Sequence, residues 1–155
     1  APALCAYEFT FVPTPEPTTP AAPTTADLND AYCSCEPESL YLDLVFIVDN
    51  SADMTTQMLG AASATIQSVL FGLSLGTEVF QSNVAALAYG DVVQVVQNFG
   101  GIRTFADIMN FNLPFLGGKA TKMTDAIKQA SSMISSNGRS YTRGVIVLLS
   151  KSYNE

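Results

Sequence analysis

The chain has 155 residues, of which 48% are hydrophobic and 14% are charged, so we expect one domain with an ordinary apolar core. Its net charge of −7 speaks against a nucleic-acid-binding protein, because such proteins need a basic surface to neutralise phosphates. The chain has no histidine, which excludes histidine-dependent nucleophilic catalysis and histidine-containing zinc sites within it, and no apolar run approaches the ~20 residues that span a bilayer.

Residues 1–39 are predicted to form a leader that precedes the domain. All three cysteines lie there, at Cys5, Cys33 and Cys35, which is typical of a secreted, disulfide-bonded protein. A bond between Cys33 and Cys35 would be strained, so we expect Cys5 to pair with one of them. Residues 12–27 hold five prolines and five threonines, which predicts an extended, protease-sensitive spacer suited to O-linked glycans.

The domain is predicted to cover residues 40–155 and to begin with a strand and a helix. Residues 42–48 are almost continuously apolar and rich in β-branched side chains, which indicates a central strand covered on both faces. Residues 54–72 carry no charge and repeat apolar residues at three- and four-residue spacing, which predicts a helix that ends near Gly72.

The remaining elements are two strands, two helices and a final strand. The short connection at Gly90-Asp91 predicts an antiparallel hairpin, and the spacing of Thr104 and Asp107 is that of a capping box. The elements expected after the first helix are strands over 83–89 and 91–99, a short helix from Thr104, a helix over 121–136 and a strand over 144–149.

This order of elements, β-α-β-β-α-α-β, predicts a three-layer α/β fold. Its open, Rossmann-like sheet should be mostly parallel, with one antiparallel edge strand. Ligands of such sheets bind beyond the carboxyl ends of the strands. The loops that should form a site are therefore 49–55, 117–124 and 150–155.

Three oxygen-bearing side chains follow the first strand, at Asp49, Ser51 and Asp53. On a turn entering a helix they could converge on a hard cation such as Mg²⁺ or Ca²⁺. The alternative is that Asp49 and Ser51 cap the helix that follows, which is the simpler interpretation of such residues.

Two segments resemble enzyme motifs but lack residues that those motifs require. Gly117-Gly118-Lys119-Ala120 lacks both the earlier glycine and the following Ser or Thr of a phosphate-binding loop. Ser51 is not in a Gly-X-Ser-X-Gly elbow and has no histidine partner. We therefore expect no enzymatic activity.

Residues 41–155 resemble a von Willebrand factor type A domain. The sequence LDLVFIVDNSADM is similar to that family's first strand and its Asp-X-Ser-X-Ser motif, LGGKATKMTDAI to its threonine loop and helix, and GVIVLLS to its fourth strand. The Cys-X-Cys at 33–35 and the phrase VDNSADMT are similar to nematode secreted proteins that couple such a domain to a C-type lectin domain.

The resemblance implies a metal-ion-dependent adhesion site, in which three loops hold a divalent ion and an acidic group of the partner completes its coordination. The family's second aspartate is replaced by Ser150, with Lys151 beside it, so the site should be degenerate and should hold Mg²⁺ or Ca²⁺ weakly or not at all. The ligands that carry over by position are Asp49, Ser51, Asp53 (for a serine of the family) and Thr121.

The function that the resemblance implies is that of a secreted, extracellular, non-enzymatic binding or adhesion module. Its ligand would be an extracellular protein or glycoprotein, and a C-type lectin domain could neighbour it. The alternative is a structural secreted protein, a mucin-like stalk with a type A domain that binds neither metal nor ligand. Domains of the family continue beyond the fourth strand, so we expect the domain to be incomplete at its C-terminus.

Overall fold

The computed structural model describes residues 40–119, 122–137, 139–140 and 142–151. The chain divides into two compact units, residues 1–35 and 36–155, and every described residue belongs to the second. The predicted Cys5 disulfide and the extended spacer lie outside the described residues. They stay predictions, as does the domain boundary at residue 40.

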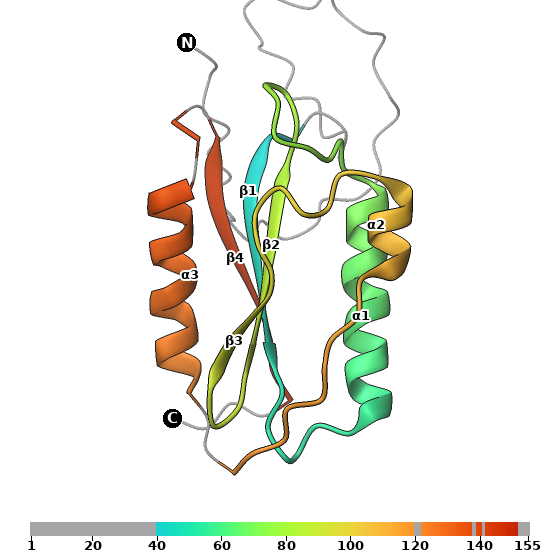
Figure 1. Ribbon diagram of the computed structural model, residues 1–155, viewed down its shortest axis with the longest axis vertical. Coiled ribbons are helices and arrows are strands. Elements are labelled where there is room, and N and C mark those ends of the chain that lie inside the picture. The colour runs from blue at the N-terminus through green and yellow to red at the C-terminus, as the bar shows by residue number, and fades with distance from the viewer. Residues whose placement is uncertain (1–39, 120–121, 138, 141, 152–155) are drawn as a thin grey trace, which may run out of the picture. The chain divides into compact units, whose positions relative to one another are not determined.

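The described elements confirm the predicted three-layer α/β fold. The sheet has the strand order β3-β2-β1-β4, in which β1 is parallel to β2 and β4 while β2 and β3 are antiparallel. Helix α3 covers one face of the sheet, and α1 and α2 lie over the other (Figure 1). The elements in chain order are β1 (Leu42–Asp49), α1 (Thr56–Phe71), β2 (Asn83–Tyr89), β3 (Val93–Gln97), α2 (Phe105–Asn110), α3 (Met123–Asn137) and β4 (Arg143–Leu149).

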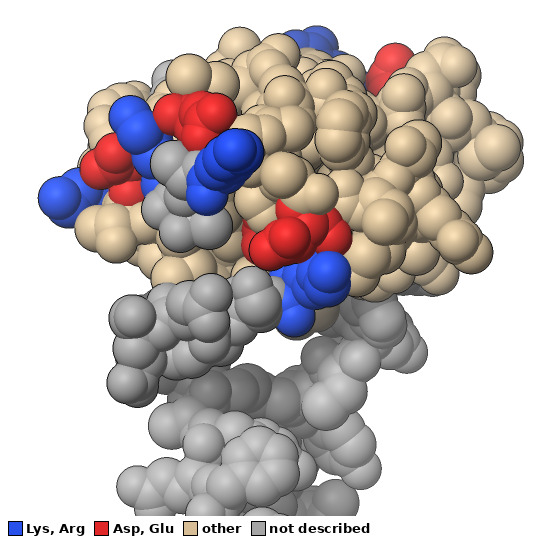
Figure 2. All heavy atoms as spheres, turned by 90° about the horizontal axis from the view of Figure 1, so that it is seen from below, with Lys and Arg blue, Asp and Glu red and all other residues tan. Residues whose placement is uncertain are grey.

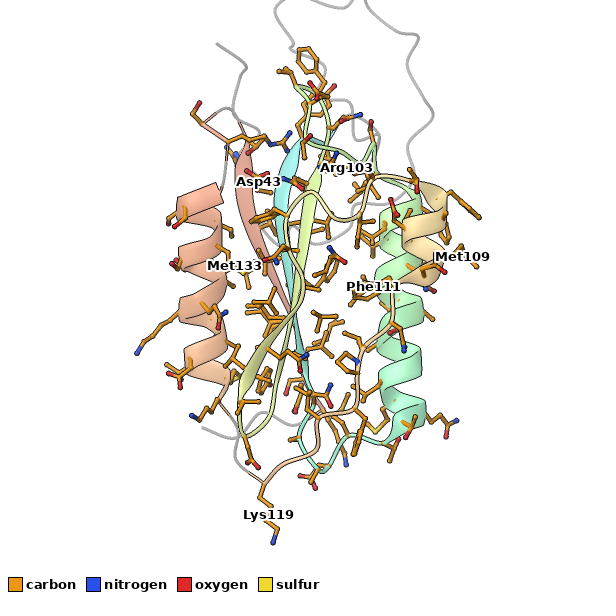
Figure 3. The ribbon with its side chains drawn as sticks, viewed as in Figure 1. Asp43, Arg103, Met109, Phe111, Lys119 and Met133 are labelled. Atoms are coloured by element: carbon orange, nitrogen blue, oxygen red, sulfur yellow. The ribbon has the colours of Figure 1, made fainter. Side chains whose placement is uncertain are left out.

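Strand β1 is central because its side chains are apolar on both faces. Val45 and Ile47 are fully buried with α3, whereas Phe46 and Val48 belong to the larger cluster that α1 covers. Figure 3 shows Phe111 directed into this second layer and Met133 of α3 directed toward the sheet. Because β1 is parallel to both β2 and β4, the carboxyl ends of these three strands lie at one edge of the sheet.

Helix α1 begins later than its apolar pattern predicts. Its N-cap is Thr55, whose side chain accepts a hydrogen bond from the backbone N–H of Met58 at 3.2 Å. The suggestion that Asp49 and Ser51 cap this helix is therefore wrong, because a separate turn, closed by Met54 N–H on the Ser51 carbonyl, precedes it. No helix among the described residues is long and apolar enough to cross a membrane.

The hairpin and the short helix form where the sequence predicts them. Strand β3 is shorter than expected, and a bulge between Ala86 and Leu87 interrupts its register with β2. Thr104 and Asp107 form both hydrogen bonds of the predicted capping box at the start of α2. The absence of a side chain matters at Gly90, where an added Cβ would lie 2.9 Å from the Gly117 carbonyl oxygen.

Candidate functional site at the carboxyl edge of the sheet

Backbone hydrogen bonds tie the loops that follow the parallel strands to one another. The Asn50 N–H, after β1, donates to the Tyr89 carbonyl at the end of β2, at 2.7 Å. The Ala52 N–H donates to the Gly118 carbonyl at 2.6 Å, so the loop between α2 and α3 also reaches this edge. The turns at the carboxyl ends of the strands are thus connected to one another by backbone hydrogen bonds.

Asp49 lies at the centre of this edge, and both of its carboxylate oxygens accept hydrogen bonds. The side chain is buried, Oδ1 accepts from the Ser51 N–H at 2.9 Å, and Oδ2 accepts from the Ser150 hydroxyl at 3.2 Å. Ser150, which the sequence resemblance placed at the position of a second aspartate, therefore donates to Asp49. Backbone and hydroxyl donors compensate the cost of burying this carboxylate.

Tyr89 extends this network and was not singled out from the sequence. Its hydroxyl donates to the Ser150 oxygen at 3.4 Å, and the residue is 1% exposed. Burial raises the pKa of Tyr89 above its usual value, and the nearby Asp49 charge raises it further, while the hydrogen bond with Ser150 opposes both. The phenol therefore stays a neutral donor at the end of a chain that runs from Tyr89 through Ser150 to Asp49.

Asp53 and Lys151 meet at the solvent side of the same edge. The Lys151 ammonium donates to the Asp53 carbonyl oxygen at 2.9 Å, so the chain's own cation lies beside the first loop. A cavity of about 160 Å³ opens between Ser51, Asp53 and Lys119. Figure 3 shows the Lys119 side chain pointing away from the domain into solvent.

Thr121, the fourth residue of the expected ligand set, lies outside the described residues. The loop that carries it is anchored on both sides, because Ala52 bonds the Gly118 carbonyl before it and the Lys122 N–H donates to the Gly90 carbonyl after it, at 3.3 Å. The Ser51 N–H donates directly to the Asp49 carboxylate, whereas Asp53 accepts a hydrogen bond from Lys151 only through its backbone carbonyl.

Asn50 is a further residue of this edge that sequence reasoning treated only as part of a turn. It is fully buried, its Nδ2 donates to the Pro114 carbonyl, and its Oδ1 accepts from the Leu116 N–H at 2.8 Å. The side chain thereby fixes the loop that leads to the glycines. Its position between Asp49 and Ser51, where two oxygen ligands were expected, was the one available signal.

The described donor set does not fit a divalent cation. Mg²⁺ requires near-octahedral oxygen ligands, and Ca²⁺ takes six to eight. Among the described residues, no group of three or more Asp, Glu or Cys side chains could hold a metal ion, and every buried polar side-chain atom has a hydrogen-bond partner. Each Asp49 oxygen already accepts one hydrogen bond, so an ion would compete with the Ser51 N–H and the Ser150 hydroxyl for this carboxylate.

Charges at this end of the domain are mixed. Most acidic atoms in Figure 2 lie next to basic ones, and uncharged surface covers much of the rest of the described face. This pattern offers no broad field of one sign to a ligand.

Comparison with known proteins agrees with the fold and the order of these loops. A family model of the von Willebrand factor type A domain matches residues 44–152, which span every described strand and helix from Leu44 onward. The chain belongs to this family. A search of curated proteins gave no match.

Two solved structures show the same type A fold at low identity. The vWF domain of the type V pili tip protein Mfa5 from Porphyromonas gingivalis is 17% identical, with a TM-score of 0.53 over 74% of this chain and 38% of that one. Proximal thread matrix protein 1 from the mussel byssus, described with a zinc-occupied MIDAS motif, is 13% identical, with a TM-score of 0.58 over 73% of this chain and 29% of that one. The present chain covers well under half of the length of either of these two chains.

Proposed function

We propose that this type A domain is an extracellular, non-enzymatic binding module whose adhesion site does not depend on a divalent cation. Type A domains commonly serve as adhesion or binding modules, and the cysteine-bearing leader is typical of secretion. A C-type lectin neighbour and an extracellular protein or glycoprotein ligand stay predictions from the resemblance.

The observation that carries the proposal is that each Asp49 carboxylate oxygen accepts a hydrogen bond from within the chain. In a metal-dependent site this carboxylate would face the ion directly or through water. Here its oxygens accept from Ser51 and Ser150, and the Lys151 ammonium lies on the adjoining Asp53 carbonyl. A cation entering this position would lose part of its ligand set and would be repelled by Lys151.

Calorimetric titration of the full chain with Mg²⁺ and Mn²⁺ tests the proposal. We expect no binding to the natural chain at ion concentrations up to about 1 mM, which corresponds to a very weak association. A double variant, Ser150→Asp with Lys151→Ala, removes the competing cation and supplies a second carboxylate beside Asp49. It should bind Mg²⁺ measurably, and adding Asp49→Ala should abolish that binding.

Two results would contradict the proposal. Micromolar Mg²⁺ affinity of the natural chain that is lost in Asp49→Ala would make the site a working metal centre. Failure of the double variant to bind any ion, in a folded domain, would mean that Ser150 and Lys151 are not what prevents metal binding.

A further inference from the structure

The amino end of the domain, opposite the carboxyl edge, exposes a cluster of aromatic side chains. The end of α1, the loop after it and the starts of β1 and α2 all lie at this end (Figure 1). Two ring pairs form there, Tyr41 with Phe80 and Phe71 with Phe105, each with centroids 5.2 Å apart. The amino-end cluster comprises the apolar residues of these segments that are between 36% and 69% exposed: Leu40, Tyr41, Phe71, Val79, Phe80 and Phe105.

Most of this cluster does not depend on what pairs with β4. In the strand order β3-β2-β1-β4, a strand added beside β4 would lie on the side away from β2. Phe71 and Phe80 belong to the connection from α1 to β2, and Phe105 follows β3, so all three belong to the other half of the sheet. Contiguous exposed apolar surface of this kind marks a site of interaction with a protein or a membrane.

Phe80 lies in a turn whose backbone conformation does not suit it. The Gln81 N–H donates to the Glu78 carbonyl at 3.3 Å, and Phe80, the third residue of this turn, has a φ of +68°. Glycine or asparagine is usual at such a position, because a bulky side chain raises the energy of the left-handed conformation. Burial does not offset this strain, since Phe80 is 65% exposed. Strain without a gain in core packing indicates a role in binding.

The base of this turn is held from inside the domain. Arg139 donates from Nη1 to the Glu78 carbonyl at 2.7 Å and from Nη2 to the Gln81 carbonyl at 2.6 Å. The Glu78 N–H donates to the Gln81 side-chain oxygen at 3.1 Å, and Arg139 is itself paired with buried Asp43. The turn is therefore fixed in advance, and the backbone groups of Glu78 and Gln81 are satisfied, which lowers the cost of entering an apolar medium.

The charges at this end select a neutral lipid surface. Residues 1–102 hold 11 acids and no Lys or Arg, and the net charge of the chain is −7, so an anionic membrane would repel it. The amino end nevertheless has both signs, because Arg103 and Arg143 are exposed there as well as Glu78 (Figure 3 labels Arg103 beside Asp43). This mixture suits a headgroup that carries both charges. A second copy is a poorer match, because two projecting turns cannot bury each other's side chains.

We propose that the amino end of the domain docks on a neutral membrane surface of the phosphatidylcholine type. Val79 and Phe80 enter the boundary between headgroups and acyl chains. Tyr41 and the pair of Phe71 and Phe105 lie at the level of the headgroups, where an aromatic ring can contact both water and hydrocarbon. This surface lies at the opposite end of the domain from the carboxyl edge, so the proposal goes beyond the proposed function and leaves that edge accessible.

A single tryptophan locates the contact, because the chain has none of its own. The full chain is prepared as Phe80→Trp and, as a matched control, as Phe115→Trp. Phe115 is 57% exposed and lies in the loop that Asn50 holds at the carboxyl edge. With phosphatidylcholine vesicles, the emission of Phe80→Trp should shift to shorter wavelength and be quenched by brominated phosphatidylcholine. The emission of Phe115→Trp should not change.

Phe80→Asn separates loss of docking from loss of folding. Asparagine tolerates a positive φ, so the urea midpoint of this variant should be unchanged or higher. Its sedimentation with phosphatidylcholine vesicles should weaken about tenfold, as expected when one Phe side chain is no longer removed from water, whereas Phe115→Asn should bind like the natural chain. Replacing part of the phosphatidylcholine with phosphatidylserine should weaken binding of the natural chain.

Three results would overturn the proposal. The first is no sedimentation of the natural chain at about 1 mM lipid, which would assign the turn to a protein partner instead. The second is an equal response of the Phe80 and Phe115 variants. The third is self-association of the natural chain that Phe80→Asn abolishes, which would assign the turn to a second copy. All three leave the Mg²⁺ titration unaffected, so failure here is distinguishable from failure of the cation-independent site.

Discussion

Replacing Arg139 should strongly destabilise the domain, because this side chain joins three segments at the amino edge of the sheet. Its Nε and Nη2 each lie 3.1 Å from Asp43 Oδ1, and its backbone N–H donates to Asp43 Oδ2 at 2.7 Å. Nη1 donates to the Glu78 carbonyl at 2.7 Å and Nη2 to the Gln81 carbonyl at 2.6 Å. Figure 3 shows Asp43 at this end of the sheet.

The magnitude follows from burial. The Arg139 side chain is 11% exposed and that of Asp43 is 2% exposed. Removing one member of a buried ion pair typically costs about 3–5 kcal/mol, because the other charge stays buried without compensation. After Arg139→Ala, Asp43 keeps the backbone N–H and the Thr142 hydroxyl, so we expect a loss near 3 kcal/mol. Arg139→Lys keeps the charge but not the forked donors and should lose about half as much.

Urea unfolding followed by circular dichroism measures this loss. With a slope of about 1–3 kcal/mol per molar urea, 3 kcal/mol should lower the midpoint by roughly 1–3 M. The matched control is Arg143→Ala, an exposed arginine four residues later, which should change stability by less than about 0.5 kcal/mol. If Arg139→Ala is too unstable to fold, Arg139→Lys still supplies the comparison. Equal midpoints for the Arg139 and Arg143 variants would refute the reasoning.

Three further predictions concern pH and backbone geometry. Burial raises the pKa of Tyr89, so the stability that the neutral phenol contributes is complete below pH ~10 and is lost as the pH rises further. The difference in stability between the natural chain and Tyr89→Phe, measured from about pH 8 to 11, should therefore fall with rising pH, and a constant difference would contradict this. A hydrogen bond from the Arg103 N–H lowers the pKa of Asp107, so its contribution is present above pH ~4 and is lost below it; Asp107→Asn should remove that part of the acid dependence in thermal melts, and an unchanged acid profile would argue against it. Gly90→Ala should lower the free energy of unfolding in urea by about 1–3 kcal/mol, because the added Cβ would lie 2.9 and 3.0 Å from two carbonyl oxygens. Gly60→Ala, whose Cβ would have nothing within 4 Å, should instead stabilise α1 by up to ~1 kcal/mol. Similar effects of the two substitutions would contradict the steric explanation.

The elements that local pattern specifies could be predicted from the sequence. The apolar run of β1, the capping box at Thr104 and the short connection after Tyr89 each depend on residues that are close together in the chain. The element order then implied the three-layer sheet and its one antiparallel pair. The start of α1 could not be predicted in this way. Apolar spacing marks which face of a helix is buried, whereas its first turn depends on the cap, which is Thr55.

The residues at the carboxyl edge show the same division between what the local sequence predicts and what only the tertiary structure decides. The sequence by itself placed Asp49, Ser51 and Asp53 in one loop after a central strand, and the resemblance identified Ser150 as a replacement for an aspartate. Only the tertiary structure decided that Ser150, 101 residues from Asp49, donates to that carboxylate.

The structure likewise decided that Tyr89 joins this network, that Asn50 fixes the neighbouring loop and that Lys151 reaches the Asp53 carbonyl. These contacts depend on strand order and on the register of β1 with β2 and β4, which bring distant strand ends to one point. The local periodicity of the sequence does not specify that register. It indicates which residues are buried, but not which strands are neighbours or how their ends align.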